Sequence, residues 1–323
     1  MAFVQFSVRR ETCAVARDSG LHRLWCNPQP GSMPSEGRWM SLKQHRRTSA
    51  RRSGRRASQA ARRNSRPRPR PAAVLPAVNH PEPYVSVIIP AMNEARTIAA
   101  VIAEARGVHP RCEVIVIVNG SADNTAEIAY SMGAKVISFT QPLGHDVGRT
   151  VGAEAARGEI LLFTDGDLVI PAADLRPFVE AVSGGEDVAL NNYSGPVRRR
   201  LPHPVVLSKY ALNIMLGRPD LQGYSLTAVP HALSRAALTA LGSASLSRPP
   251  LAYARAILDG LKVKAVHKVP VGRMNAVRRK AEGKDPLQEI ILRDHLEAVA
   301  LLLERRGKRA GYGDAGRRRE MVR

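Results

Sequence analysis

The stretch "LLFTDGDLVIP" runs from Leu161 to Pro171 and joins an apolar run to a pair of acids. The apolar run predicts a buried strand, and Asp165 and Asp167 follow it directly. An unpaired buried carboxylate is costly, so a positive group is expected beside them. Two carboxylates one residue apart can approach Mg²⁺ or Mn²⁺ together, while water and phosphate oxygens fill the other metal positions. A solvated turn or a helix cap is the alternative for an isolated acidic pair.

Strands and helices alternate on the amino-terminal side of the acidic pair. The runs "VSVIIP", "EVIVIV", "AKVISF" and "EILLFT" predict four strands that start at Val85, Glu113, Ala134 and Glu159. Between them, apolar residues recur at helical spacing, and Ser121 is placed to cap the second helix. Nearly continuous apolar strands separated by helices predict a parallel sheet covered on both faces. Its ligand is expected at the carboxyl ends of the strands.

The alternation loosens after Pro171. The expected elements are helices near 173–182, 205–216, 231–241, 250–258 and 286–305, and strands near 187–192, 224–229 and 261–269. Together with the first four strands they predict an α/β fold, with a Rossmann-like, mainly parallel sheet and helices on both faces. Residues 81–306 are expected to form this domain.

The charge of the chain is uneven. The 323 residues carry a formal net charge of +21, most of which lies before residue 80. Residues 1–80 are rich in Arg, Ser and Pro and lack apolar periodicity, so we expect a disordered basic arm. This arm is either a solvated tail or a polybasic segment that contacts the membrane surface, another polyanion or nucleic acid. An over-extended gene start, with Met33 or Met40 as the true first residue, is a further alternative.

Residues 307–323 are expected to form a second, shorter basic tail. Cys13, Cys26 and Cys112 lack the spacing of a metal site, which favours a reduced, cytoplasmic protein. No apolar run reaches the roughly 18–20 residues that a transmembrane helix needs. The sequence therefore predicts no integral membrane segment and leaves peripheral contact with the inner face of the membrane open.

Three stretches in register resemble a known family. They are "VSVIIPAMNEARTI", "VIVNGSADNT" and "LGHDVGRTVGAEAARGEILLFTDGD". Their order and spacing resemble the family-2 glycosyltransferases, whose nucleotide-sugar-binding domain has the fold called GT-A. The resemblance covers 85–170 closely and continues more loosely to about residue 271. It implies a nucleotide-sugar half at 81–170 and an acceptor half with a closing helix at 171–306.

The resemblance implies roles for individual positions. Those implied to bind the nucleotide sugar are Pro90, Asn93, Glu94, Asn119, Ser121, Asp123, Arg149 and Asp165. Asp165 and Asp167 match the family's D-x-D, which implies Mg²⁺ or Mn²⁺ against the diphosphate of a nucleotide-sugar donor. Val118 and Asn119 stand where many members have two aspartates, one of which contacts the base in typical UDP-sugar users. A UDP-sugar is favoured, but the base stays open.

The expected catalytic base is missing from its usual place. The family's Glu-Asp pair should fall near "LSRPPLAYARAILDG", where Pro249 and Pro250 stand instead. Asp220 is a candidate catalytic carboxylate on the acceptor side, and Gly223 would allow close backbone approach there. A loop aspartate and a turn glycine are the alternative. If the enzyme retains configuration, no such base is needed, and His267 becomes a candidate third metal ligand or else a structural histidine.

Further cations lie on the predicted acceptor side. Arg198 and Arg199 follow a predicted strand in a loop that either faces a phosphate group or is merely solvated. Together with the basic stretch "RMNAVRRKAEGK" they favour an anionic acceptor. His295 lies on the closing helix and is expected to be a satisfied core or cleft residue.

These observations predict a metal-dependent glycosyltransferase of the hexosyltransferase type, which moves a sugar from a nucleotide diphosphate to an unidentified acceptor. The resemblance extends this expectation to envelope polysaccharide or glycolipid synthesis. A non-catalytic nucleotide-sugar-binding scaffold is one alternative, because the Glu-Asp pair is absent. A protein that binds nucleic acid or an anionic surface through its basic arm is another, although aromatic residues make up only 4% of the chain.

Overall fold

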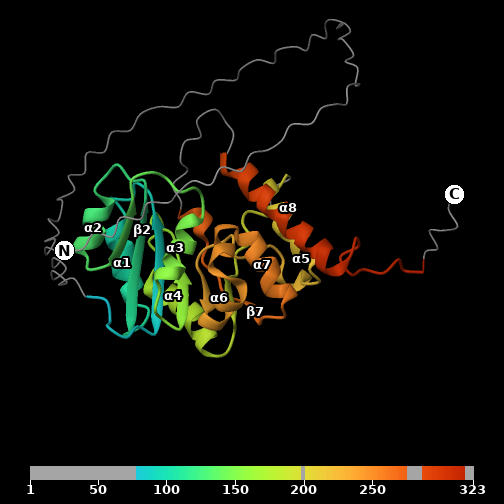
Figure 1. The fold of residues 1–323 in the computed structure, drawn as a ribbon, viewed down its shortest axis with the longest axis horizontal. Helices are drawn as coiled ribbons and strands as arrows, with labels where there is room; N and C mark the ends of the chain where they lie inside the picture. The colour runs from blue at the N-terminus through green and yellow to red at the C-terminus, as the bar shows by residue number, and fades with distance from the viewer. Residues whose placement is uncertain (1–77, 198–200, 275–285, 317–323) are drawn as a thin grey trace, which may run out of the picture. The chain divides into compact units, whose positions relative to one another are not determined.

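A computed structural model of the chain describes residues 78–197, 201–274 and 286–316 (Figure 1). The predicted arm over 1–80 lies outside the described residues except for its last three positions. Arg198, Arg199 and most of the second basic stretch also lie outside them. No helix within these ranges is both long enough and apolar enough to span a bilayer.

Seven strands form one sheet in the order β3-β2-β1-β4-β6-β5-β7. They are β1 (Val85–Ala91), β2 (Cys112–Asn119), β3 (Lys135–Phe139), β4 (Ile160–Phe163), β5 (Val188–Asn191), β6 (His231–Ser234) and β7 (Val263–His267). Strand β6 is antiparallel to both neighbours, β4 and β5, whereas the other pairs are parallel. The carboxyl ends of six strands therefore meet at one edge of the sheet.

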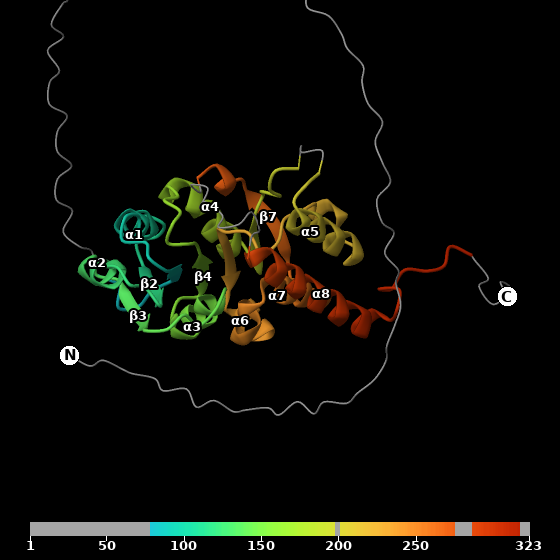
Figure 2. The same cartoon turned by 90° about the horizontal axis from the view of Figure 1, so that it is seen from above.

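Helices cover both faces of the sheet (Figure 2). They are α1 (Ile98–Arg106), α2 (Thr125–Ser131), α3 (Val147–Ala155), α4 (Ala172–Ser183), α5 (Pro204–Met215), α6 (Arg235–Leu241), α7 (Pro249–Leu258) and α8 (Pro286–Arg306). Because side chains alternate along a strand, Val87 and Ile89 join the apolar core on the side of α1 and α4. Ile88 joins the second core, which contains residues of α3, α5, α7 and α8. The predicted α/β fold with both faces covered is confirmed.

The strand order reverses at β1. Strand β1 pairs with β2 on one side and with β4 on the other, so the connections from β1 run in opposite directions. In open α/β sheets such a reversal opens a crevice at the carboxyl ends of the strands, where ligands bind. The acidic turn after β4 lies at this point.

The segment 224–241 differs from the prediction. No strand forms at 224–229, and the predicted helix at 231–241 begins with strand β6 and becomes helical only at Arg235. Ser234 ends the strand and caps the helix, because its hydroxyl accepts a hydrogen bond from the Ala237 N–H at 3.0 Å. The predicted cap of the second helix is also wrong, since α2 begins after Asn124 and Ser121 bonds elsewhere.

Candidate active site

The acidic turn Asp165-Gly166-Asp167 is held by the end of β1. The Gly166 N–H donates to the Pro90 carbonyl oxygen at 3.0 Å, and the Thr97 hydroxyl donates to the Gly166 carbonyl oxygen at 2.8 Å. A Cβ atom at Gly166 would lie 2.9 Å from Cβ of Ala91, so only glycine fits between the two acids without displacing backbone. The predicted site residue Pro90 thus contributes its carbonyl oxygen to the position of the acidic turn.

Arg149 lies beside the acidic turn on helix α3. Its Nη2 atom is 3.5 Å from Oδ1 of Asp165, and its Nη1 atom is 2.9 Å from Oδ1 of Asp146. The guanidinium can reach this position because Gly148 and Gly152 let α3 lie close to β1 and β2. A Cβ at Gly152 would lie only 2.3 Å from Cγ2 of Ile88. The structure therefore brings two residues of separate motifs, Arg149 and Asp165, into one ion-pair network.

Three carboxylates, those of Asp146, Asp165 and Asp167, influence one another at the acidic turn. Desolvation raises the pKa of the Asp165 carboxyl above its ordinary value. The charge of Arg149 opposes this shift, whereas the carboxylates of Asp167 and Asp146 add to it. A nearby positive group favours the ionised form of Asp165, and a divalent cation is one such group.

The carboxylates supply part of a metal site. Among the described residues, no group of three or more His, Cys, Asp or Glu side chains could hold a metal ion. Mg²⁺ commonly takes one or two carboxylates and completes its shell with water and substrate phosphates, so the Asp165 and Asp167 pair fits that mode of binding. A metal held only by protein ligands does not fit.

The loops after β1 and β2 interlock through their motif residues. The Asn93 N–H donates to the Ser121 hydroxyl at 2.9 Å, and the Ala122 N–H donates back to Oδ1 of Asn93 at 2.8 Å. The Glu94 N–H donates to the Thr125 hydroxyl at 2.8 Å. These bonds place the predicted residues Asn93, Glu94 and Ser121 side by side at the crevice.

Asp123 belongs to the same pair of loops. Its carboxylate accepts the Ala95 N–H at 3.1 Å and also bonds the hydroxyl and N–H of Thr125. The Thr125 hydroxyl is the largest cause of the lowered pKa of Asp123. The structure thus gives Asp123 a positioning function for the loops, and its predicted contact with the nucleotide stays a prediction.

Asn119 connects β2 to the loop before α3. Its amide donates to the Gly144 carbonyl oxygen at 3.2 Å and accepts the Leu143 N–H at 2.7 Å. Val118 beside it is buried in the core. The positions where relatives carry two aspartates are therefore occupied here by a core residue and by an amide whose two ends hold a loop.

Two residues at the crevice were missed by the sequence analysis. Asp146 has a left-handed backbone conformation and contacts both His145, at 3.1 Å, and Arg149. His231, at the start of β6, stacks on Phe163 with ring centroids 5.0 Å apart. Burial and the nearby charge of Arg149 lower the pKa of His231 to about 3, so it stays neutral. His231 was missed because residues 231–234 form a strand where a helix was predicted. Asp146 could have been predicted as a site residue, because it is an acid three positions before Arg149.

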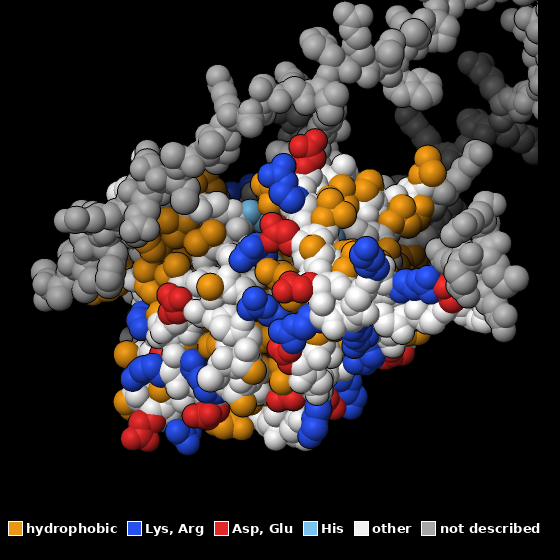
Figure 3. Space-filling view, turned by 45° about the vertical axis from the view of Figure 1, so that its right-hand side comes forward, with side chains coloured by type: hydrophobic (Ala, Val, Ile, Leu, Met, Phe, Trp, Pro, Cys, Tyr) orange, Lys and Arg blue, Asp and Glu red, His pale blue; other side chains and the backbone are white. Residues whose placement is uncertain are grey.

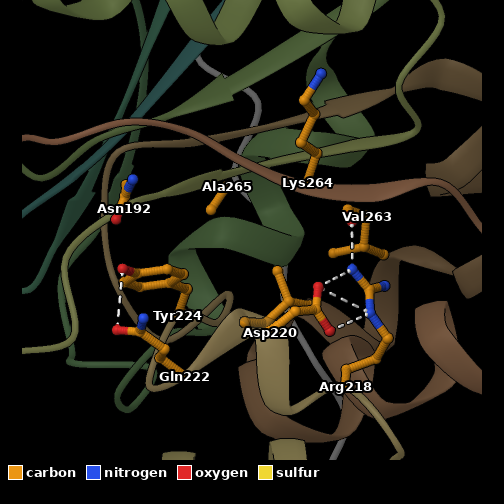
Figure 4. A pocket seen from close by; sticks show the side chains of 9 residues that line it. Asn192, Arg218, Asp220, Gln222, Tyr224, Val263, Lys264 and Ala265 are labelled. Atoms are coloured by element: carbon orange, nitrogen blue, oxygen red, sulfur yellow. Dashed lines mark hydrogen bonds and ion pairs between the residues drawn. The ribbon is translucent and has the colours of Figure 1, made fainter.

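Asp220 lies on a separate hollow of about 340 Å³ (Figure 4). The hollow is lined by Asn192, Arg218, Asp220, Leu221, Gln222, Tyr224, Val263, Lys264 and Ala265, and neither acid of the acidic turn is among them. The Arg218 guanidinium clamps the Asp220 carboxylate at 2.8 and 3.0 Å. This contact lowers the pKa of Asp220, which makes the carboxylate a weaker base.

A smaller hollow of about 160 Å³ adjoins the first one. The two share Asn192, Gln222 and Tyr224, and the smaller hollow adds Tyr193, Tyr210 and Lys268 among others. Gly223 approaches Tyr210 closely, since a Cβ there would lie 2.7 Å from Cε2 of the ring. Gly223 is thus packed against Tyr210 and Ser194, and its predicted role on the acceptor side stays a prediction.

His267 does not meet the acidic pair. Its Nε2 atom lies 3.0 Å from Oδ1 of Asp174 on α4, and its ring packs edge-on against Phe178. No described three-residue metal group includes it. The hypothesis of His267 as a third metal ligand is thus not supported by the geometry, because the histidine is held at the β7 end by its own acidic partner.

Helices α5 and α8 bury three ionisable residues. Lys209 is 7% exposed, and burial lowers its pKa to about 8. Asp294 is 8% exposed, and burial together with the charges of Glu297 and Asp146 raises its pKa to about 6. His295 donates from Nδ1 to the Ile291 carbonyl oxygen at 2.7 Å, but its buried Nε2 has no hydrogen-bond partner among the described residues. The expected satisfied histidine is therefore only half satisfied.

Comparison with known proteins gives the family. Residues 86–225, which contain both interlocked loops, the acidic turn and Gly223, match the family model described as glycosyl transferase family 2. This part of the chain is similar to glycosyl transferase family 2. The family resemblance inferred from the three motifs is confirmed.

Individual relatives of this glycosyltransferase domain are distant. A dolichyl-phosphate hexose transferase of Haloferax volcanii is 33% identical over 91 residues, which are 28% of this chain and 40% of that protein. The chain thus matches about two-fifths of the length of this curated relative.

Solved structures with a similar fold are also distant. Glucosyl-3-phosphoglycerate synthase from Mycobacterium tuberculosis, in complex with Mn²⁺, UDP and glucosyl-3-phosphoglycerate, has 25% identity and a TM-score of 0.48, over 72% of this chain and 82% of that one. The same synthase with Mg²⁺ and UDP gives the same values.

Proposed function

We propose that the protein is a metal-dependent glycosyltransferase that moves a sugar, a hexose in the favoured case, from a nucleotide-diphosphate donor to a separate acceptor. The observation that carries the proposal is the acidic turn at the strand-order reversal, with Arg149 paired to Asp165 and the carboxylates of Asp146 and Asp167 nearby. A UDP-sugar is the favoured donor. The name of the Haloferax relative, a hexose transferase, supports the type of sugar.

In this proposal the residues of the crevice divide the work. Asp165 and Asp167 would hold Mg²⁺ or Mn²⁺, which when bound neutralises charge on the departing nucleoside diphosphate. Arg149 keeps the Asp165 carboxylate in place and adds positive charge at the same edge. The loops with Asn93 and Ser121 form the wall against which the nucleoside packs.

The proposed acceptor side comprises the two adjoining hollows. Lys268 contributes positive charge and Tyr210 a flat apolar surface, which suits an acceptor with an anionic group and a sugar-like or apolar body. Arg198 and Arg199 remain predicted contacts of this side. Asp220 is proposed as a residue that orients the acceptor through the Arg218 pair and not as the proton acceptor.

Replacement of the acidic pair tests the proposal. With UDP-sugars and Mn²⁺, Asp165→Asn and Asp167→Asn should lower release of the nucleoside diphosphate by at least about a hundredfold, because the charge on the leaving group is no longer compensated. EDTA should abolish the wild-type activity. Asp174→Asn, which removes the exposed partner of His267, is the matched control and should retain activity. Undiminished turnover in either turn variant would exclude the mechanism.

A non-catalytic nucleotide-sugar-binding protein is the second candidate. It is favoured by Pro249 and Pro250, which are buried in the first turn of α7 where an acid pair is expected. The same assay separates the two candidates when it is combined with thermal unfolding. A donor at 100 times its dissociation constant stabilises the fold by about 2.7 kcal/mol, so a metal-dependent rise of the melting temperature without any turnover would favour the second candidate.

A further inference from the structure

Helix α5 has the reverse of the usual polarity of a surface helix. Its sequence "PVVLSKYALNIM" contains a single charged residue, Lys209, and that residue is buried. The exposed side consists of Pro204, Leu207, Ala211 and Ile214, which recur at helical spacing. Leu207 and Ile214 are 52% and 55% exposed. A surface helix normally places its charges outward, so this apolar stripe indicates an apolar environment outside the protein.

The apolar stripe continues beyond the amino-terminal end of α5. Leu201, three residues before the helix, is 85% exposed, and Val197 is 44% exposed. Figure 3 shows a face of the molecule where hydrophobic side chains gather at the upper right, while acidic and basic side chains mingle below. We call Leu201, Pro204, Leu207, Ala211 and Ile214 the α5 stripe.

Cations lie at the carboxyl end of the α5 stripe. The Arg306 guanidinium donates to the carbonyl oxygen of Leu216, the residue that follows α5, at 3.2 Å. The Tyr312 hydroxyl donates to the Ile214 carbonyl oxygen, so the segment after α8 lies against the same end. Arg306 and Lys308 are exposed there. In the sequence, three further arginines, Arg198–Arg200, directly precede the stripe.

We propose that the α5 stripe docks on the surface of an anionic lipid bilayer. Exposed apolar side chains flanked by Lys and Arg are the pattern by which interfacial helices insert shallowly while cations contact lipid headgroups. A second copy of the chain is the other occupant that such an apolar stripe could take, and the test below distinguishes it from a bilayer. Tyr210, on the flank of the same helix, lines the smaller hollow, so docking places that hollow next to the lipid surface.

Docking of the α5 stripe on a bilayer does not depend on the proposed function, and it can be tested by a binding measurement that needs no enzymatic turnover. The full chain is mixed with vesicles of phosphatidylcholine alone or with 30% phosphatidylglycerol, and bound protein is measured by sedimentation at about 0.15 M and 1 M NaCl. High salt screens contacts through the basic arm, which leaves apolar insertion as the main contribution. Leu207→Glu is compared with Tyr130→Glu, a control on α2 where Tyr130 is 76% exposed.

The expected result is roughly tenfold or greater loss of partition to anionic vesicles for Leu207→Glu, because the variant removes apolar surface from the stripe and adds a charge that anionic headgroups repel. Tyr130→Glu should bind like the wild type, and both variants should keep their melting temperatures. Equal vesicle binding by Leu207→Glu and the wild type would overturn the proposal. So would a wild-type dimer in solution that Leu207→Glu converts to a monomer, because the stripe would then be a contact between copies.

Discussion

Residues 81–170, the proposed nucleotide half, and residues 171–306, the proposed acceptor half, offer two contrasting uses of polar side chains. In the nucleotide half, the side chains of Asn93 and Asp123 accept hydrogen bonds from the backbone of the neighbouring loop and so hold the two loops together. In the acceptor half, burial lowers the pKa of Lys209, and Nε2 of His295 has no hydrogen-bond partner among the described residues. Buried polar groups are normally paired, so the loop residues Asn93 and Asp123 add rigidity, whereas Lys209 and His295 each cost stability.

The largest effect that tests this comparison is expected in the nucleotide half. In Gly152→Ala the new methyl group would lie 2.3 Å from Cγ2 of Ile88, a buried branched side chain with no room to move. We expect the free energy of unfolding to fall by about 2–3 kcal/mol through overpacking. Denaturant unfolding measures the change. Arg149 lies on the same helix as Gly152, so a shift of α3 would also move the guanidinium. Donor binding should therefore weaken as well.

Gly148→Ala is the matched control on α3. Its Cβ would lie 3.2 Å from Cβ of Pro90, a contact that a small shift relieves, and alanine favours the helix. The loss should therefore be clearly smaller than that of Gly152→Ala. Equal losses for the two variants would show that the packing of α3 on the sheet is not as tight as the structure indicates.

The two halves also differed in how well their sequence predicted them. Strands β1 to β4 were predicted because each is a largely apolar run separated from the next by a helix, as in a parallel sheet. Strand β6 was missed because its four residues gain their structure from distant partners, as in the pairing of His231 with Phe163. Its last residue, Ser234, is also the cap of α6, so the strand and the helix were taken as one helix.

The site was also predictable only in part: the motif residues were placed correctly, whereas the surroundings of Asp220 and His267 were not. The motifs placed Asn93, Ser121, Arg149 and Asp165 at one sheet edge, and the structure brings their loops together there. The positions of Asp220 and His267 depend on contacts with Arg218 and Asp174, which no spacing in the sequence reveals. A motif specifies a loop, whereas an ion pair between separate elements is decided only by the tertiary fold.

A gain in stability is expected in the acceptor half. Burial lowers the pKa of Lys209 to about 8, so at pH 7 the folded state carries a charged lysine at a cost that the unfolded chain avoids. Lys209→Met should therefore raise the free energy of unfolding by roughly 2 kcal/mol at pH 7. The wild type should gain stability as the pH rises from about 8 toward 10, because the folded protein then loses its proton before the unfolded chain does. The advantage of the variant should shrink over the same range.

Lys308→Met is the control for charge alone. Lys308 is exposed, so its loss should change the free energy of unfolding by less than about 0.5 kcal/mol. A destabilised Lys209→Met protein would contradict the comparison, since it would mean that the buried ammonium has a compensating partner. Chemical denaturation of the three proteins at pH 7 and pH 10 gives all the values required.

The smallest effect is expected at Asp294, where the two halves meet electrostatically through Asp146. Burial raises the pKa of Asp294 to about 6, so its ionised form costs stability at neutral pH and its protonated form does not. Asp294→Asn should be more stable than the wild type by about 1 kcal/mol at pH 7.5. This difference should shrink as the pH falls through 6 and vanish near the ordinary pKa of an aspartate.

Glu297→Gln removes one of the charges that raise the pKa of Asp294. In that background the stability difference between Asp294→Asn and its parent should be smaller, and its pH midpoint should be lower. A difference that is independent of pH would show that Asp294 is not strained by its charge, and the contrast between the halves would then rest on Lys209 and His295 alone.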